Sequence, residues 1–276
     1  MIRQPAVAGR FYPSDAGELA RQVASFLAAA DASKQSARRR AIACMLPHAG
    51  YMYSGHVAGA VLAAVDLPRR FIILCPRHTH EGQPLAILSQ GAWRTPLGDA
   101  PLDSELAAAL RRACPMLQED AAAHRFEHAI EVEIPFLQQA APEFRFVPIV
   151  LGVDRLPILE ELASAIARVL RESTARGNEP VMIIASSDMN HYEPDDVTRS
   201  KDARAIERIL ALDGRGLHET VRREGITMCG YAPATVMLLA AKELGAARAE
   251  LIRYATSGDI NGDRDEVVGY AGILIE

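Results

Sequence analysis

Three histidines and one cysteine occupy positions where a metal ion or a proton could be bound. His48, His78 and His191 each follow a short apolar run typical of a buried strand, and Cys229 lies just before a long apolar run of helical character. Parallel strands bring their carboxyl ends to one edge of a sheet, so we expect these side chains to converge there. Imidazole nitrogens and a thiolate together suit iron, copper or zinc.

Each of these residues has a simpler interpretation when it is taken alone. A single histidine after a strand is most often a hydrogen-bonded loop residue, and Cys229 could be an inert buried cysteine. However, Cys229 precedes Gly230 and a helix with Pro233 in its first turn, where the helix N-terminus would stabilise a thiolate. The convergence of several such residues is what favours a metal site.

The elements that must position these residues alternate along the chain. Apolar runs predict strands, and segments with apolar residues at helical spacing predict helices between them. The predicted strands are 41–46, 71–75, 85–88, 144–151, 181–185, 251–255 and 267–275. The predicted helices are 14–30, 57–65, 103–112, 126–141, 156–170, 195–212, 217–224 and 234–244. This alternation indicates an α/β sandwich, a single domain over residues 1–276 with a mostly parallel central sheet.

The bulk composition excludes several classes of protein. The chain has 276 residues, a formal net charge of -5 and a pI near 5.9, and its basic cluster is confined to residues 38–40, so we expect no nucleic-acid partner. No apolar stretch approaches the roughly 18 residues of a membrane span, and no signal-peptide pattern is present. Four cysteines without CxxC spacing indicate no disulfide framework. We therefore expect a cytoplasmic protein that does not associate with a membrane.

Several short motifs together identify a family resemblance. They are Pro5-Ala6-Val7-Ala8-Gly9-Arg10-Phe11-Tyr12-Pro13, Pro47-His48-Ala49-Gly50-Tyr51, Pro76-Arg77-His78, Glu127-His128-Ala129-Ile130-Glu131, Ser186-Ser187-Asp188 through His191, and Thr227-Met228-Cys229-Gly230. As a set these motifs resemble the Memo family, the proteins related to the human mediator of ErbB2-driven cell motility. The resemblance is to its prokaryotic members, which are labelled AmmeMemoRadiSam system protein B, and it runs nearly end to end.

This resemblance implies a fold and a ligand set. The family is similar in fold to the class III extradiol dioxygenases, which hold non-haem iron(II) with two histidines and a carboxylate. By that resemblance His48, His78 and Cys229 fall on the metal-ligand positions, with Cys229 where the dioxygenases have a carboxylate. His191 falls near the position of their catalytic acid/base histidine. Because a thiolate is softer than a carboxylate, iron(II) or copper is the expected metal and zinc is a further candidate.

Other polar and aromatic residues are expected around the metal. Metal-bound imidazoles usually donate their second nitrogen to a carboxylate, and aromatic rings can contact a substrate. The candidates for these roles are Tyr51, His128, Glu131, Asp188 and Tyr231, with Glu127 and Glu133 as further carboxylates. A rival interpretation is that His124, Glu127 and His128 form the H-x-x-E-H motif of the inverted zincins. Five residues match such a pattern easily by chance.

Two functional hypotheses follow. The first is a metal-dependent redox protein, an oxygenase of a small aromatic or modified-nucleobase-like substrate. The second is a non-enzymatic binding module whose cleft receives a peptide or a partner protein. The prokaryotic family label implies an AMMECR1-like protein and a radical SAM protein as partners in one system, whereas the signalling role of the animal members favours a binding module.

Overall fold

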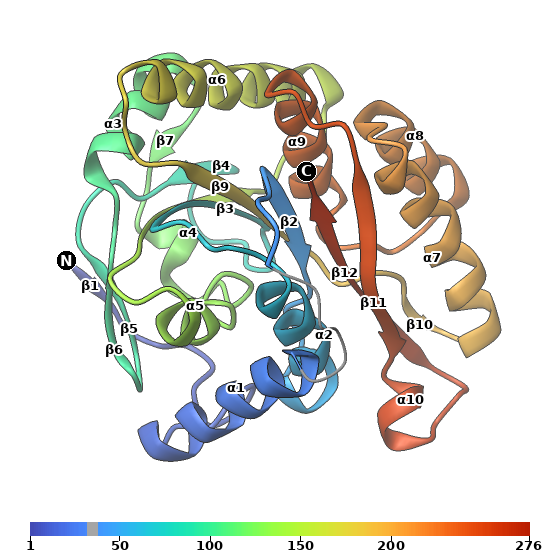
Figure 1. The fold of residues 1–276 in the computed structure, drawn as a ribbon. Coiled ribbons are helices and arrows are strands. Elements are labelled where there is room, and N and C mark those ends of the chain that lie inside the picture. Colours follow the sequence, from blue (N-terminus) through green and yellow to red (C-terminus); the bar gives the residue numbers. More distant parts are fainter. Residues whose placement is uncertain (32–37) are drawn as a thin grey trace.

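The computed structural model describes residues 1–31 and 38–276, and a nine-stranded sheet runs through its centre (Figure 1). Four neighbouring parallel strands form the middle of this sheet. In spatial order they are β2 (Ala43–Leu46), β9 (Val181–Ser186), β3 (Arg70–Pro76) and β8 (Arg145–Leu151). β9 lies between β2 and β3, with Leu46 opposite Ser186 and Leu74 opposite Ala185. The loops that leave β2, β9 and β3 therefore start side by side.

The flanks of the sheet are largely antiparallel. β12 runs antiparallel to β2 and to both β10 and β11, and β4 runs antiparallel to β8 and parallel to β7. These flanking strands are β4 (Leu85–Ile87), β7 (Gln118–Glu119), β10 (His191–Glu193), β11 (Ala249–Thr256) and β12 (Val267–Ile275). The predicted α/β class is confirmed, but the sheet is mixed, and the predicted parallel order is limited mainly to its centre.

Helices cover both faces of the sheet. One face carries α3 (Ser104–Ala113), α6 (Leu156–Ala175), α7 (Asp195–Leu210), α8 (Gly214–Glu224) and α9 (Tyr231–Glu243). The other face carries α1 (Ala16–Asp31), α2 (Tyr51–Ala63) and α5 (Ile134–Ala140). Two short helices, α4 (Ala122–Arg125) and α10 (Gly258–Asn261), lie in connections. None of the helices in the described ranges has the length and apolar character needed to cross a membrane.

The alternating side chains of β3 show how the sheet supports two cores. Ile72 and Leu74 pack against the α6 and α9 side, whereas Phe71, Ile73 and Cys75 pack against the α1 and α2 side. All five are fully buried. Each such burial contributes about 1.5–3 kcal/mol for a large apolar side chain, so this strand is a rigid base for the loop that follows it. Cys75 thus behaves as a small buried hydrophobe.

A second, smaller sheet holds the N-terminus. It contains β1 (Ile2–Arg3), β5 (Ala92–Thr95) and β6 (Gly98–Pro101), in the order β1, β5, β6. The sequence predicts only a turn-rich segment at 91–101, and the structure has a hairpin there. Gly91 permits the close approach of the N-terminal residue: its φ is 112°, and a Cβ at this position would lie 1.9 Å from the Met1 carbonyl oxygen.

The predicted helix 126–141 is wrong in its first half. Residues 126–128 are irregular and 129–133 form turns, and the helix begins only at Ile134. Polar side chains in this segment bond to distant parts of the chain, because Glu131 accepts hydrogen bonds from the N-terminal segment and Glu127 accepts them from His78. The apolar side chains whose spacing predicts a helix are still buried; Ile130, for example, is fully inaccessible.

Candidate metal centre

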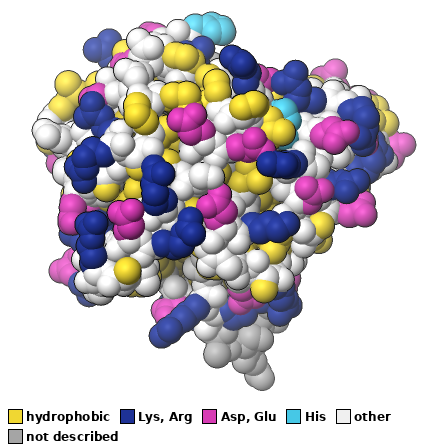
Figure 2. Space-filling view, turned by 90° about the horizontal axis from the view of Figure 1, so that it is seen from above, with side chains coloured by type: hydrophobic (Ala, Val, Ile, Leu, Met, Phe, Trp, Pro, Cys, Tyr) yellow, Lys and Arg dark blue, Asp and Glu magenta, His cyan; other side chains and the backbone are white. Residues whose placement is uncertain are grey.

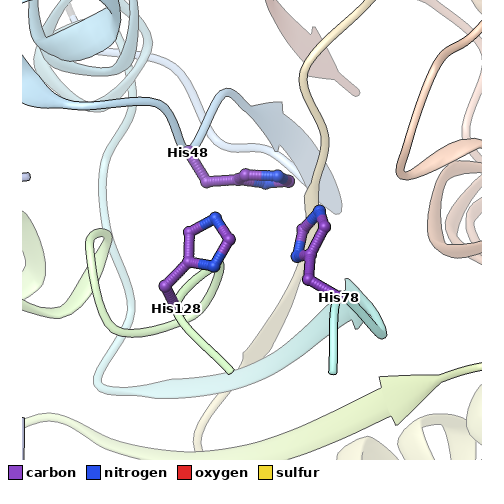
Figure 3. Close-up of side chains that lie close together, drawn as sticks. All are labelled: His48, His78 and His128. Carbon is purple, nitrogen blue, oxygen red and sulfur yellow. The ribbon is translucent and has the colours of Figure 1, made fainter. Parts of the chain in front are cut away.

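Three histidine rings face a common point beyond the carboxyl ends of the central strands (Figure 3). His48 follows β2, His78 follows β3, and His128 lies in the turns before α5. One nitrogen from each ring lies within 4.8 Å of a nitrogen from each of the others. The ring centroids are 5.1 Å apart for His48 and His78, 5.6 Å for His48 and His128, and 4.5 Å for His78 and His128.

The hydrogen bonds of His48 fix which nitrogen is available to a ligand. Its Nδ1 lies 2.8 Å from the Ser186 hydroxyl, and that hydroxyl donates to the Ala129 carbonyl oxygen at 3.0 Å. A hydroxyl has one hydrogen to donate, so Ser186 accepts from Nδ1–H of His48. Nε2 then carries the lone pair. The backbone N–H of His48 donates to Asp188 Oδ1 at 2.8 Å, which ties the loop after β2 to the loop after β9.

Glu127 orients His78 in the same way. Its Oε1 lies 2.8 Å from His78 Nδ1, and its Oε2 accepts the His78 backbone N–H at 2.6 Å. Burial acts to raise the pKa of Glu127, but the hydrogen bond and charge of His78 outweigh it and bring the pKa to about 2. Burial acts to lower the pKa of His78, and Glu127 outweighs that effect and raises it. The ionised carboxylate accepts Nδ1–H and leaves Nε2 to the centre.

The two other rings of the cluster are neutral near pH 7. Burial, together with the charge of His48, lowers the pKa of His128 to about 4. Burial, together with the charge of His78, lowers the pKa of His48 well below its usual value. Nδ1 of His128 lies 3.6 Å from Glu127 Oε1, and its ring packs edge-on to Phe11 with centroids 4.9 Å apart. Neutral imidazoles are the form that binds a metal.

Cys229 lies against His48. Its Sγ is 3.3 Å from His48 Nε2 and accepts the backbone N–H of Asp188 at 3.3 Å. It is not in the group of three within which all ligand atoms lie close together. Burial and then the charge of Asp188 raise the pKa of the thiol, so the expected stabilisation of a thiolate by the N-terminus of α9 is outweighed. Cys229 is partly exposed, whereas the other three cysteines are buried.

His191 is held at the first residue of β10. Its Nδ1 lies 2.9 Å from the Thr227 carbonyl oxygen, and its backbone N–H donates to Thr227 Oγ1 at 2.7 Å. A carbonyl can only accept, so Nδ1 carries the proton and Nε2 is available to another group. Burial raises the pKa of Asp188 and a positive charge on His191 opposes that rise, while burial and, to a smaller degree, the same charge lower the pKa of His48, so His191 is within electrostatic reach of the centre.

Of the other residues that the sequence offers as candidates, two lie at the centre and three form hydrogen bonds elsewhere. Asp188 contacts both His48 and Cys229, and His128 is one of the three clustered rings. Three candidates bond elsewhere: the Tyr51 hydroxyl donates to the Val132 carbonyl at 2.6 Å, the Tyr231 hydroxyl donates to Asp154 at 2.9 Å, and Glu131 accepts from Arg3, Ala6, Val7 and Tyr12. These three support the surrounding fold.

The rival H-x-x-E-H arrangement does not form. α4 ends at Arg125, so His124 and His128 are not one turn apart on a continuous helix. His124 is fully buried against Trp93, with ring centroids 5.8 Å apart, and neither of its ring nitrogens has a hydrogen-bond partner in the described part of the chain. Burial lowers its pKa to about 3.

Two residues that contribute to the site were not predicted. Ser186 fixes the tautomer of His48, and Thr227 fixes that of His191. Ser186 is the last residue of β9, so its place at the end of an apolar strand was the available signal. Nothing in the spacing of Thr227 indicates that its carbonyl oxygen meets a histidine 36 positions earlier in the chain.

The fold and the site define an α/β protein with a histidine-rich candidate metal centre at the carboxyl edge of its central strands. Residues 3–274 match the family described as Memo-like protein, and the chain belongs to that family. It is 43% identical to a MEMO1 family protein of Methanopyrus kandleri, with 99% of each chain covered. It is 40% identical to a MEMO1 family protein of Methanothermobacter thermautotrophicus, with 98% of this chain and 99% of the relative covered. A MEMO1 family protein of Methanosarcina barkeri is also 40% identical, over the full length of both chains.

Proposed function

We propose that this chain binds one transition-metal ion through Nε2 of His48, Nε2 of His78 and the thiolate of Cys229, with His128 as a further imidazole donor beside them. The observation that carries the proposal is the fixed pair of tautomers. Ser186 and Glu127 each bind an Nδ1 atom, so the lone pairs of His48 and His78 are on Nε2, and that of His48 meets only Cys229 Sγ, itself a proposed ligand. Such outer partners are typical of metal-bound histidines.

The donor set fits a borderline or soft cation. Two or three imidazoles with a thiolate suit iron(II), copper or zinc, and iron(II) or copper remains our expectation. The backbone N–H of Asp188 points at Sγ and favours negative sulfur. Because the pKa of the thiol is raised, Cys229 gives up its proton only when a cation takes its place. A bound ion of this type would supply Lewis-acid or redox chemistry.

Elemental analysis of protein purified without chelators tests the metal proposal. We expect about one ion per chain in the wild type and at least a tenfold loss of affinity in His48→Ala and His78→Ala, because even the loss of an outer hydrogen-bond partner typically costs about 10–100-fold. His80→Ala is the matched control, because His80 lies in the same exit loop as His78, is exposed and is not in the cluster. Equal affinity in the wild type and both ligand variants would refute the proposal.

The roles of Cys229 and His128 are separated by a second pair of variants. If Cys229 is a ligand, Cys229→Ser weakens binding, and the wild-type protein with copper(II) or cobalt(II) shows a sulfur-to-metal charge-transfer band that the variant lacks. If His128 is the third ligand instead, His128→Ala weakens binding and the serine variant keeps wild-type affinity. This second result would replace the thiolate in the proposed ligand set.

We extend the proposal to redox chemistry on a small aromatic substrate, with His191 as the proton donor or acceptor. Tyr192 supports this role: it is 72% exposed beside His191, with ring centroids 5.6 Å apart, and its φ of 59° is unusual for an aromatic residue. Oxygen uptake with catechols should require metal and fall at least tenfold in His191→Ala while metal content is retained. The likeness to extradiol dioxygenases stays a prediction. Lack of uptake by metal-loaded protein would favour the binding-module hypothesis, in which the cleft receives a peptide or a partner protein. An AMMECR1-like protein and a radical SAM protein stay proposed partners in a shared pathway.

A further inference from the structure

A cleft of about 340 Å³ lies between α3 and α6, and its lining carries more positive than negative side chains. Its charged lining residues are Arg70, Arg112, Arg168, Arg176, Glu105 and Glu172. Arg70 is the first residue of β3, at the end of the strand opposite the loop that carries His78. The cleft is therefore separate from the candidate metal centre.

Arg70 is the buried charged residue of this cleft. It is 3% exposed, and its Nε donates to Asp103 Oδ2 at 2.6 Å. Neither of its Nη atoms has a hydrogen-bond partner among residues 1–31 and 38–276. Asp103 is shared further: its Oδ1 caps α3 by accepting the Leu106 N–H, and its Oδ2 also meets Arg145 Nε at 3.1 Å. Arg145 is also paired with Glu179 at 3.7 Å, so Arg70 shares Asp103 with a second guanidinium group while its own Nη donors stay unused.

Two of the three rim arginines, Arg112 and Arg168, have no carboxylate partner in the described part of the chain, whereas Arg176 has one. Arg168 donates to the Ala113 carbonyl oxygen at 2.8 Å, which caps the end of α3, and it forms no ion pair within the described ranges. Arg112 has neither a hydrogen bond nor an ion pair there. Arg176 lies 3.5 Å from Glu172. Interaction with helix C-termini accounts for arginines on α3 and α6, but it does not account for Arg70, which lies on a strand.

The positive charge of the cleft is local. On the face of the molecule that is seen from above α6, basic and acidic side chains are interspersed and no broad basic surface forms (Figure 2). A broad basic surface would fit a long polyanion, whereas a small cleft fits a small one. Guanidinium groups bind oxyanions through paired N–H donors.

We propose that the cleft between α3 and α6 binds a small multivalent oxyanion, a phosphoryl or carboxylate compound, through Arg70, Arg112 and Arg168. Arg70 provides the inner donors, and the two rim arginines close over the ligand from α3 and α6. This site depends on residues that take no part in the metal centre.

Isothermal titration of the full chain with inorganic pyrophosphate and with citrate, at constant ionic strength set by sodium chloride, tests the proposal. We expect saturable binding of one anion per chain, weakened at least fivefold in Arg112→Gln and in Arg168→Gln. Tighter binding of pyrophosphate would identify a phosphoryl ligand, and tighter binding of citrate a carboxylate ligand. Arg112 is exposed and unpaired in the described chain, so its variant should fold normally.

The matched control is Arg111→Gln, which removes the same charge from the neighbouring position of α3. Arg111 pairs with Glu119 at 3.3 Å and does not line the cleft. The Arg111→Gln variant should bind the anion as tightly as the wild type does, and so should the His78→Ala variant. The absence of saturable binding at millimolar anion, or an equal loss in Arg111→Gln, would overturn the proposal.

Discussion

Glu127 is the residue that links burial, charge and ligand geometry in the candidate centre. It is fully buried, yet it stays ionised because it accepts both the backbone N–H and the Nδ1–H of His78. The same contacts raise the pKa of His78, whereas His48 and His128 have lowered values. His78 and Cys229 are therefore the groups that must release protons before a cation can bind near neutral pH.

This division predicts how metal affinity depends on pH. Protons compete with the metal at His78 and Cys229, whose pKa values are raised, so affinity should increase as the pH rises from 6 to 8. In Glu127→Gln the charge that raises the pKa of His78 is removed, so His78 should lose its proton at a lower pH. The part of the increase in metal affinity that is due to His78 should therefore occur at a lower pH than in the wild type. Metal titrations at constant ionic strength measure both curves, and an affinity that falls with rising pH would contradict the assignment.

The same ion pair also makes the stability of the fold depend on pH. The pKa of Glu127 is lowered to about 2, so its contribution is present above its unfolded value and is lost as the pH falls toward 2. The pKa of His78 is raised, so its contribution is complete below its unfolded value and is lost as the pH rises through the folded value. The pair is thus most stabilising in mildly acidic solution, where the metal competes least well.

At the scale of elements, the N-terminal segment acts as a strap over the turns that carry His128. Glu131 accepts the backbone N–H groups of Ala6 and Val7, the hydroxyl of Tyr12 and a guanidinium N–H of Arg3. The Arg3 and Glu131 side chains are 5% and 0% exposed. Glu131, which the sequence offers as a candidate hydrogen-bond partner of a metal ligand, thus holds a neighbouring segment in place.

Removing one member of this buried pair should be costly. Glu131→Gln leaves Arg3 buried without its charge partner, so we expect a loss of about 3–5 kcal/mol in the free energy of unfolding. Urea denaturation followed by circular dichroism measures it. Glu243→Gln is the control, because its pair with Arg171 is exposed and should contribute little. A variant as stable as the wild type would show that the strap is dispensable.

Local signals in the sequence predict some of these elements well and others poorly. The start of the helix predicted at 103–112 is right, because Asp103 caps it through a contact with the Leu106 N–H only three residues away. The irregular segment at 126–133 is not predicted, because long-range hydrogen bonds prevent a helix there. Glu127 bonds to a residue 49 positions earlier in the chain, and Glu131 bonds to one more than 110 positions earlier. Likewise His48 and His78 are predicted from strand ends, whereas the inclusion of His128 in the cluster depends on that same segment.

At the scale of the whole molecule, the candidate ligands come from loops that meet only in the folded chain. His48 follows β2, His78 follows β3, and Cys229 precedes α9. Because these residues are far apart in the sequence, the unfolded chain offers no preformed site. A metal that binds only the folded state stabilises it by about 2.7 kcal/mol at a hundredfold excess over its dissociation constant. Thermal melts should therefore shift upward with metal in the wild type and His80→Ala but not in His48→Ala. An equal shift in all three would indicate binding elsewhere.

The position of β9 has a consequence for the order of events during synthesis. β2 and β3 do not pair with each other, because residues 181–186 lie between them. A nascent chain that has emerged only to residue 140 already contains all three clustered histidines, but it lacks the strand that sets the spacing of two of them. Ser186, which orients His48, and Cys229 emerge later still. Under the proposed ligand set, a complete metal site therefore forms only after the second half of the chain has been translated.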